Sequence, residues 1–279
     1  MSEGWSFFTV QITLIAVVLI LHTYMGLHVI RRTIIFCDLV LDQLAALGML
    51  GSIAVGTQYA TGSSYVLPTL AVFVGAFLLA VINPRTPLIP REAVIGIMFA
   101  MALVATLLLG DKLSGGDAYV TKTLSGAMLW ANWQLVAVTA AVYVVLLLIH
   151  YRFRRQFIAL TDNPESLRHR KYWDFLFFAT QGVITVLIVP IAGVLLAYAF
   201  LMIPAAIAAM FSKGWLRAVV LGWSIGFAAC VVGLVLSYNA DLPYGPTLVL
   251  ALGVCFGGAI LIRSATAASV GPRMRRRLS

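Results

Sequence analysis

Residues 173–211 read WDFLFFATQGVITVLIVPIAGVLLAYAFLMIPAAIAAMF and carry no charged side chain after Asp174. An α-helix needs about 20 apolar residues to cross the hydrocarbon core of a membrane. The 39 residues of this stretch therefore predict two spans joined by a tight turn near Pro190 and Gly193. One long kinked helix followed by a re-entrant piece is the alternative. Both interpretations place the stretch in lipid.

The rest of the chain has the same apolar character. Of its 279 residues, 62% are hydrophobic and 10% are charged, whereas about a quarter of the residues in a soluble domain are charged. The apolar runs predict an all-α integral membrane protein, a polytopic bundle of about nine transmembrane helices in a single domain over residues 1–279. Residues 111–127 are expected to be a turn-rich outer loop. The predicted spans are residues 7–29, 38–57, 65–83, 93–110, 128–150, 173–191, 193–211, 216–237 and 245–262.

The basic residues predict the orientation of these spans. If the amino terminus lies outside, 17 of the 19 Lys and Arg residues fall on the inner side, and only Lys112 and Lys122 remain outside. Because cytoplasmic loops are enriched in Lys and Arg, we expect an outer amino terminus and a cytoplasmic carboxyl terminus. The net charge of +9 is then mainly a topology signal. Attraction to anionic lipid or to a cytoplasmic partner is a secondary use, and nucleic acid is not indicated.

Several functional classes lack their usual sequence signs. The chain has no GxxxxGK[ST] phosphate loop, so it is not expected to bind and hydrolyse ATP alone. Cys37, Cys230 and Cys255 are isolated, which indicates packing rather than a disulfide framework or a CxxC metal site. An intramembrane hydrolase would need an opposed carboxylate or nucleophile. An ion-coupled secondary transporter, which is the alternative function, would usually show an inverted repeat, and none is visible.

Two carboxylates begin the second expected span, in the sequence IIFCDLVLDQ of residues 34–43. Asp38 and Asp42 are four residues apart, which places both on one face of a helix. Ionisable residues are costly inside a membrane and usually mark an ion path, and carboxylate oxygens suit divalent cations. The pair therefore predicts an acidic ladder for a metal ion, with the deeper Asp42 as its principal member. The alternative is that Asp38 caps the helix, or that Arg31 or Arg32 pairs with these carboxylates.

Other polar residues in the spans have simpler explanations. A lone helical histidine is more often a packing residue than a ligand, so His22 and His28 are expected to pack and to form hydrogen bonds. Gln134 and Gln181 are expected to form hydrogen bonds between helices. The small-residue spacing GWSIG at residues 222–226 predicts a close contact with a neighbouring helix.

Several motifs together resemble one family. They are GLHVIRR at residues 26–32 followed by Asp38 and Gly48, TDNPE at 161–165, GVLL at 193–196, LMIPAAIA at 201–208 and SYNADLPYGPTLVL at 237–250. In this order they are similar to motifs of the membrane permeases of zinc, manganese and iron ABC importers. The resemblance covers residues 20–262.

The resemblance implies a permease subunit that moves a divalent metal ion (Mn, Zn or Fe) through the bacterial inner membrane into the cytoplasm. Two such chains would pair, here as a homodimer. A separate ABC ATPase subunit would hydrolyse ATP, and an extracytoplasmic metal-binding protein would deliver the ion. No tightly bound cofactor is expected.

The family commonly has a histidine four residues after the second-span aspartate, where this chain has Asp42. The resemblance therefore implies an ion pathway of Asp38, Asp42 and Gln43, with the two carboxylates as metal ligands. Aspartate in place of histidine favours manganese or ferrous iron over zinc.

The same resemblance implies that the element at residues 201–212 ends in a short cytoplasmic coupling helix. We expect Pro204 to break the span there, because proline removes a backbone hydrogen bond. A kinked helix without a coupling role is the alternative. The residues expected to couple to the ATPase are Met202, Ile203, Pro204, Ala205, Ala206, Lys213 and Arg217.

Overall fold

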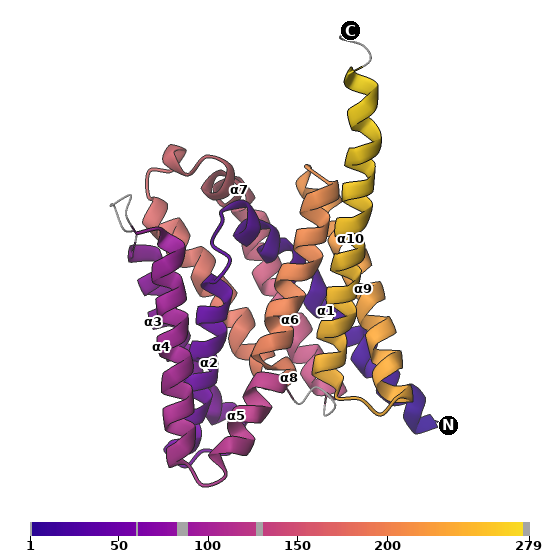
Figure 1. Cartoon of the computed structure of the whole chain (residues 1–279). Coiled ribbons are helices and arrows are strands. Elements are labelled where there is room, and N and C mark those ends of the chain that lie inside the picture. The colour runs from indigo at the N-terminus through magenta and orange to yellow at the C-terminus, as the bar shows by residue number, and fades with distance from the viewer. Residues whose placement is uncertain (1, 60, 83–88, 127–130, 276–279) are drawn as a thin grey trace.

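The structure is a computed structural model, and it describes residues 2–59, 61–82, 89–126 and 131–275. Within these ranges the chain is helical, without strands, as predicted. Figure 1 shows the long helices side by side in one bundle, with the end of the last helix projecting beyond it. The elements are α1 (Ser2–Arg31), α2 (Cys37–Ala54), η1 (Gly62–Tyr65), α3 (Val66–Val81), α4 (Arg91–Lys112), α5 (Gly116–Ser125), α6 (Trp133–Arg152), α7 (Arg154–Asp162), η3 (Pro164–Ser166), α8 (Arg170–Phe211), α9 (Trp215–Asn239) and α10 (Tyr244–Arg275).

Eight helices in the described part of the chain are long and apolar enough to cross a membrane, and α8 has the length of two crossings. Its 42 residues include one with non-helical backbone angles, Gly193, at φ 77° and ψ 162°. Glycine adopts positive φ without the steric cost that a side chain brings. The turn expected near Gly193 is therefore present.

The contacts of α8 show that it reverses direction at this glycine. Near its start, Asp174 forms an ion pair with Arg32. Just after its end, the carbonyl of Lys213 accepts a hydrogen bond of 2.8 Å from Arg31. Since Arg31 and Arg32 are adjacent, both ends of α8 lie at the same end of the bundle. Within the described residues the chain therefore traverses the bundle nine times, so that the start of α1 and the end of α10 lie at opposite ends of the bundle (Figure 1).

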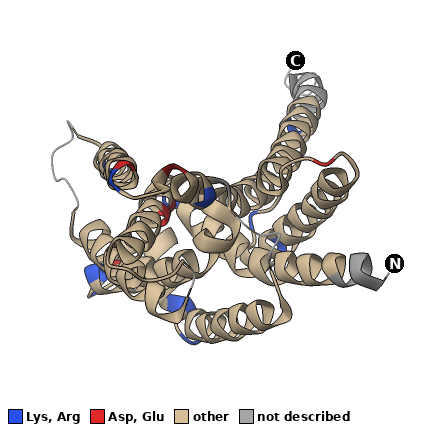
Figure 2. Cartoon of the chain, turned by 90° about the horizontal axis from the view of Figure 1, so that it is seen from below, with Lys and Arg blue, Asp and Glu red and all other residues tan. Residues whose placement is uncertain are grey.

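Helix α8 lies at the centre of the bundle. Helices α1, α2, α3, α9 and α10 all pack against it, and most of its residues are buried. By contrast α4, α6 and α9 leave large apolar side chains exposed, which suits a surface in contact with lipid. Figure 2, a view along the bundle, shows that charged residues are few and that most of each helix is uncharged.

Some boundaries differ from the sequence-based prediction. Residues 116–125 form the helix α5 inside the expected outer loop, and this helix packs against α4 and α8. The helix α6 begins at Trp133, because the Asn132 side chain accepts a hydrogen bond of 2.9 Å from the amide of Leu135 and caps it. The expected start of that span at 128 lies outside the described residues.

The described basic residues separate between the two ends of the bundle. Lys112 ends α4, and Lys122 of α5 lies over the Tyr59 ring, with its Nζ 4.4 Å from the ring centroid. Arg31 and Lys213 meet at the opposite end. This separation agrees with the predicted topology, whereas the side of the membrane on which each end lies stays a prediction.

Candidate functional site

The two carboxylates of α2 face a matching pair of polar side chains on α8. Asp38 Oδ1 accepts a hydrogen bond of 2.5 Å from Gln181 Nε2. The Thr185 side chain forms a hydrogen bond with Asp42. Both pairs have the i, i+4 spacing, so each occupies one face of its helix. The structure thus brings four oxygen-bearing side chains together between two packed helices, and all four are buried.

Two oxygens of this cluster have no hydrogen-bond partner among the described residues. They are Asp42 Oδ2 and Gln181 Oε1, and both are inaccessible to solvent. A buried polar atom without a partner costs free energy, and such atoms are rare in native structures. A hard cation accepts lone pairs from carboxylate and amide oxygens. The cluster therefore has the chemistry of a cation site that spans two turns of α2.

The cluster has fewer ligands than a closed metal cage. Within the described ranges, no group of three or more His, Cys, Asp or Glu side chains comes together to hold a metal ion. The cluster supplies two carboxylates, one amide and one hydroxyl. Asp38 and Asp42 are separated by about 6 Å along the helix axis, at 1.5 Å per residue. An ion held by few ligands at two successive levels can move on, which is what passage requires.

The structure shows neither of the alternatives considered for Asp38, a helix cap or an ion pair with Arg31 or Arg32. The residue before α2 is Phe36, and α2 has no side-chain capping hydrogen bond. Arg32 pairs with Asp174 instead, and Arg31 binds the Lys213 carbonyl. Among the described residues, no basic side chain forms an ion pair with either carboxylate of the cluster.

Gln43 lies apart from the two carboxylates. Its Nε2 donates a hydrogen bond of 2.9 Å to Thr106 Oγ1, which places it toward α4 rather than α8. One residue along a helix turns a side chain by about 100°, so neighbours in sequence cannot share the face that carries Asp38 and Asp42. The structure therefore does not bring Gln43 into the cluster.

Gln181 and Thr185 replace it as the additional polar members. Gln181 forms the interhelical hydrogen bond that the sequence predicts, whereas Gln134 is exposed at the start of α6. A signal for both was present, because Gln181 and Thr185 are spaced i, i+4 within an otherwise apolar run. Their partner on α2 was not predicted, since it depends on which helix packs there.

The two histidines of α1 bind neighbouring groups within the protein. His22 Nδ1 lies 3.0 Å from the Val18 carbonyl oxygen, and its ring stacks on Tyr143. His28 Nδ1 lies 2.6 Å from Thr161 Oγ1. Both are buried, and the packing role predicted for them agrees with these contacts.

A second group of charged residues, Arg32, Asp174 and Arg170, lies at the start of α8. The ion pair between Arg32 and Asp174 is almost completely buried, with side chains 7% and 4% exposed. Arg170 Nε lies 3.7 Å from the other Asp174 oxygen. The Arg32 guanidinium lies over Phe177, with its Cζ 5.0 Å from the ring centroid. The charges of Arg32, Arg170 and Asp174 therefore compensate one another at the start of α8.

The helix break expected at Pro204, in the segment predicted to couple to an ATPase, is absent. The helix α8 continues through Pro204 to Phe211, and Gly193 is its only non-helical residue, so Pro204 does not break the span. The next helix, α9, starts at Trp215 after a three-residue connection, and the coupling role expected of this segment stays a prediction.

Residues 202–206 are packing residues in this fold. Met202, Pro204 and Ala205 are buried, and Ile203 and Ala206 are partly buried. A Cβ on Gly226 of α9 would lie 2.7 Å from Pro204 Cγ, which shows how closely α8 and α9 approach at the small residues 222–226. Of the predicted coupling residues, only Lys213 and Arg217 are exposed.

The α8–α9 connection is instead tied to α1 and α7. The Arg31 guanidinium lies over Trp215, with its Cζ 4.1 Å from the ring centroid. Trp215 Nε1 donates a hydrogen bond of 3.4 Å to Asp162 Oδ2. The exposed residues Lys213 and Arg217 therefore flank Trp215, which is bound to α7.

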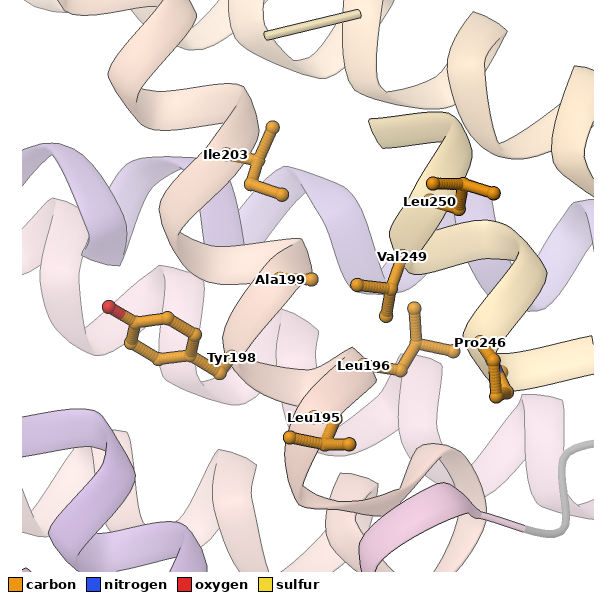
Figure 3. A pocket seen from close by; sticks show the side chains of 9 residues that line it. Leu195, Leu196, Tyr198, Ala199, Ile203, Pro246, Val249 and Leu250 are labelled. Carbon is orange, nitrogen blue, oxygen red and sulfur yellow. The ribbon is translucent and has the colours of Figure 1, made fainter. Parts of the chain in front are cut away.

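The motif at residues 237–250 forms the turn between α9 and α10. Ser237 Oγ donates a hydrogen bond of 2.8 Å to the Leu242 carbonyl, and Asp241 has a positive φ of 50°. Beyond the turn, Pro246 and Val249 line an apolar pocket of about 500 Å³ against α8 (Figure 3). Its lining is almost entirely apolar side chains, so this pocket lacks the ligands that an ion needs.

Comparisons with known proteins agree with this arrangement. The model of the ABC 3 transport family matches residues 7–263. The manganese import system permease protein ScaB of Streptococcus parasanguinis is 24% identical over 207 residues, which cover 72% of this chain and 73% of that protein. An uncharacterised membrane protein of Synechocystis is 25% identical over 169 residues, and the match covers 59% of this chain and 60% of that protein.

The fold is also similar to a solved structure. PsaBC from Streptococcus pneumoniae, in complex with Fab, superposes with a TM-score of 0.72 at 20% identity, covering 90% of this chain and 89% of the other. At that identity the likeness concerns the fold alone. Since the family model matches nearly the whole described bundle, this chain belongs to the ABC 3 transport family.

Proposed function

We propose that this chain is the permease subunit of an ABC importer that carries a divalent metal ion into the cytoplasm, and that the ion passes the Asp38–Asp42 pair. The observation that carries the proposal is the buried pair itself, which has no basic partner within the described residues and leaves Asp42 Oδ2 without a hydrogen bond. Carboxylates without a counter-charge are costly inside a membrane, and those that occur there usually mark an ion pathway. Membership of the family supports the same function.

The donor set favours manganese or ferrous iron as the ion. Carboxylate, amide and hydroxyl oxygens are hard ligands, whereas zinc binds readily to histidine and cysteine. The cluster contains oxygen donors from Asp38, Asp42, Gln181 and Thr185. The names of relatives support this choice, since ScaB is a manganese import permease.

We propose the partners from two features of the chain, the missing phosphate loop and the positions of its exposed basic residues. The sequence has no phosphate loop, so a separate ATPase subunit would supply the energy. Its docking surface would include the exposed Lys213 and Arg217 beside α7. A metal-binding protein would deliver the ion at the end that carries Lys112 and Lys122. A second copy of the chain would complete the pathway.

Metal uptake by the assembled transporter tests the proposal. Asp42→Asn preserves the shape of the side chain and removes its charge, so manganese uptake should fall at least tenfold while the protein level in the membrane is unchanged. Asp117→Asn is the matched control, because Asp117 is exposed on α5 at the opposite end. Wild-type uptake by Asp42→Asn would show that the ion takes another route.

A further inference from the structure

Two hollows meet at the basic end of α6, on the outside of the bundle and away from the acidic cluster. The first has a volume of about 630 Å³ and is lined by Arg152, Arg154, Arg155 and Tyr151, among others. The second has a volume of about 420 Å³ and is mainly apolar. Tyr151 and Arg154 line both. The two hollows therefore lie next to each other on either side of Tyr151 and Arg154, and we call them together the α6 groove, with a cationic part and an apolar part.

The cationic part has three guanidinium groups that are free to bind an anion. Arg152, Arg154 and Arg155 are exposed, and within the described residues none of them forms an ion pair. Arg154 lies over the Tyr151 ring, with its Cζ 4.8 Å from the centroid. Phe153 separates the end of α6 from the start of α7, and the three arginines around this break line the same hollow. Guanidinium groups bind phosphate oxygens in a bidentate manner.

The apolar part runs between α6 and α9, which both pack against α1. Ile20, Leu147, Leu216 and Val219 line it. Leu216 is 78% exposed, so this part opens on the perimeter of the bundle, where acyl chains lie. Tyr151, 68% exposed, stands at the junction with the cationic part, a position at which aromatic residues mark the membrane interface.

We propose that the α6 groove binds one anionic phospholipid, with its phosphodiester at Arg152, Arg154 and Arg155 and an acyl chain between α6 and α9. A free phosphate ion or an acidic protein segment would use only the cationic part. The apolar hollow next to that part, at the perimeter, favours a lipid, which needs both. Basic pockets between transmembrane helices at the cytoplasmic side are suited to anionic head groups.

The bound lipid would also touch the surface proposed for ATPase docking. Leu216 and Val219 belong to the first turns of α9, directly after the α8–α9 connection. A lipid in the groove would pack α6 against this part of α9. The site stands on its own observations, however, and does not depend on the ion that the chain carries.

The test uses the purified full chain in a neutral detergent, with lipid binding measured by native mass spectrometry. The probes are phosphatidylglycerol, phosphatidylcholine with the same acyl chains, and inorganic phosphate. We expect one saturable site that binds phosphatidylglycerol about tenfold more tightly than phosphatidylcholine, because each basic residue near the head group adds several-fold. The triple variant Arg152→Gln, Arg154→Gln, Arg155→Gln should lose this preference. Arg168→Gln, an exposed residue outside the groove, is the control and should keep it.

A second pair of variants tests the apolar part. Val219→Phe should fill the groove and weaken phosphatidylglycerol binding several-fold, whereas Val220→Phe, at an exposed neighbouring position outside the groove, should not. Equal binding of the two lipids would overturn the proposal, as would inorganic phosphate binding as tightly as phosphatidylglycerol. It would also be overturned if the triple variant kept lipid binding and lost only its association with the ATPase subunit, since the arginines would then belong to a protein interface.

Discussion

This protein has two buried acidic groups, and they are built differently. Asp174 is held by Arg32 and Arg170, and its charge is balanced within the protein. Asp38 and Asp42 are as deeply buried, yet they face only an amide and a hydroxyl. The first group links α8 to the connection between α1 and α2. The second group leaves Asp42 Oδ2 without a partner, and we propose that the ion binds there. Whether a buried carboxylate has a counter-charge thus separates a structural role from a transport role.

The largest effect on stability is expected from Asp174→Asn. Removing one partner of a buried ion pair leaves the Arg32 charge uncompensated and costs about 3–5 kcal/mol. Thermal unfolding in detergent, followed by tryptophan fluorescence, measures the loss. Asp42→Asn is the comparison, because it removes an unpaired carboxylate and should leave the unfolding temperature unchanged or raise it. The distinction between the two groups would fail if Asp42→Asn were the more destabilising change.

A smaller effect is expected from Gln181→Leu. This change removes the hydrogen bond to Asp38 and costs about 1–3 kcal/mol, because a buried acceptor loses its donor. It also removes an oxygen that we assign to the ion site, so manganese uptake should fall several-fold. Gln134→Leu, at the exposed glutamine of α6, should leave uptake unchanged. Equal uptake by the two variants would limit the site to the carboxylates.

The smallest effect is expected from Gln43→Leu. The variant loses the hydrogen bond to Thr106, at a net cost of about 1 kcal/mol. Because Gln43 faces α4, uptake should stay within about twofold of the wild-type value. A loss as large as that of Asp42→Asn would return Gln43 to the ion pathway and would mean that the path runs between α2 and α4.

Local patterns in the sequence were enough to predict the bundle. Apolar runs of the right length correspond to the helices, because the length of a span is set by the membrane alone. The glycine at 193 supplied the turn that divides α8. The common face of Asp38 and Asp42 follows from helix geometry, and the structure confirms it.

Features that depend on tertiary contacts could not be predicted in this way. Arg32 finds its partner 142 residues away in Asp174, and no local pattern marks that pairing. Gln181 and Thr185 joined the site only because α8 packs against α2. Pro204 was expected to break a helix, but close packing against Gly226 of α9 holds the helix continuous. In each case the neighbouring helix decides the outcome.

Manganese binding to the purified chain tests most directly whether the unpaired carboxylates take the ion. Electron paramagnetic resonance of free Mn²⁺ measures how much metal the protein removes from solution. We predict that the wild-type chain and Asp117→Asn bind one manganese ion per chain, and that Asp38→Asn and Asp42→Asn each weaken binding at least tenfold. Binding by Asp42→Asn that matches the wild type would contradict the assignment of the ion to the Asp38–Asp42 pair.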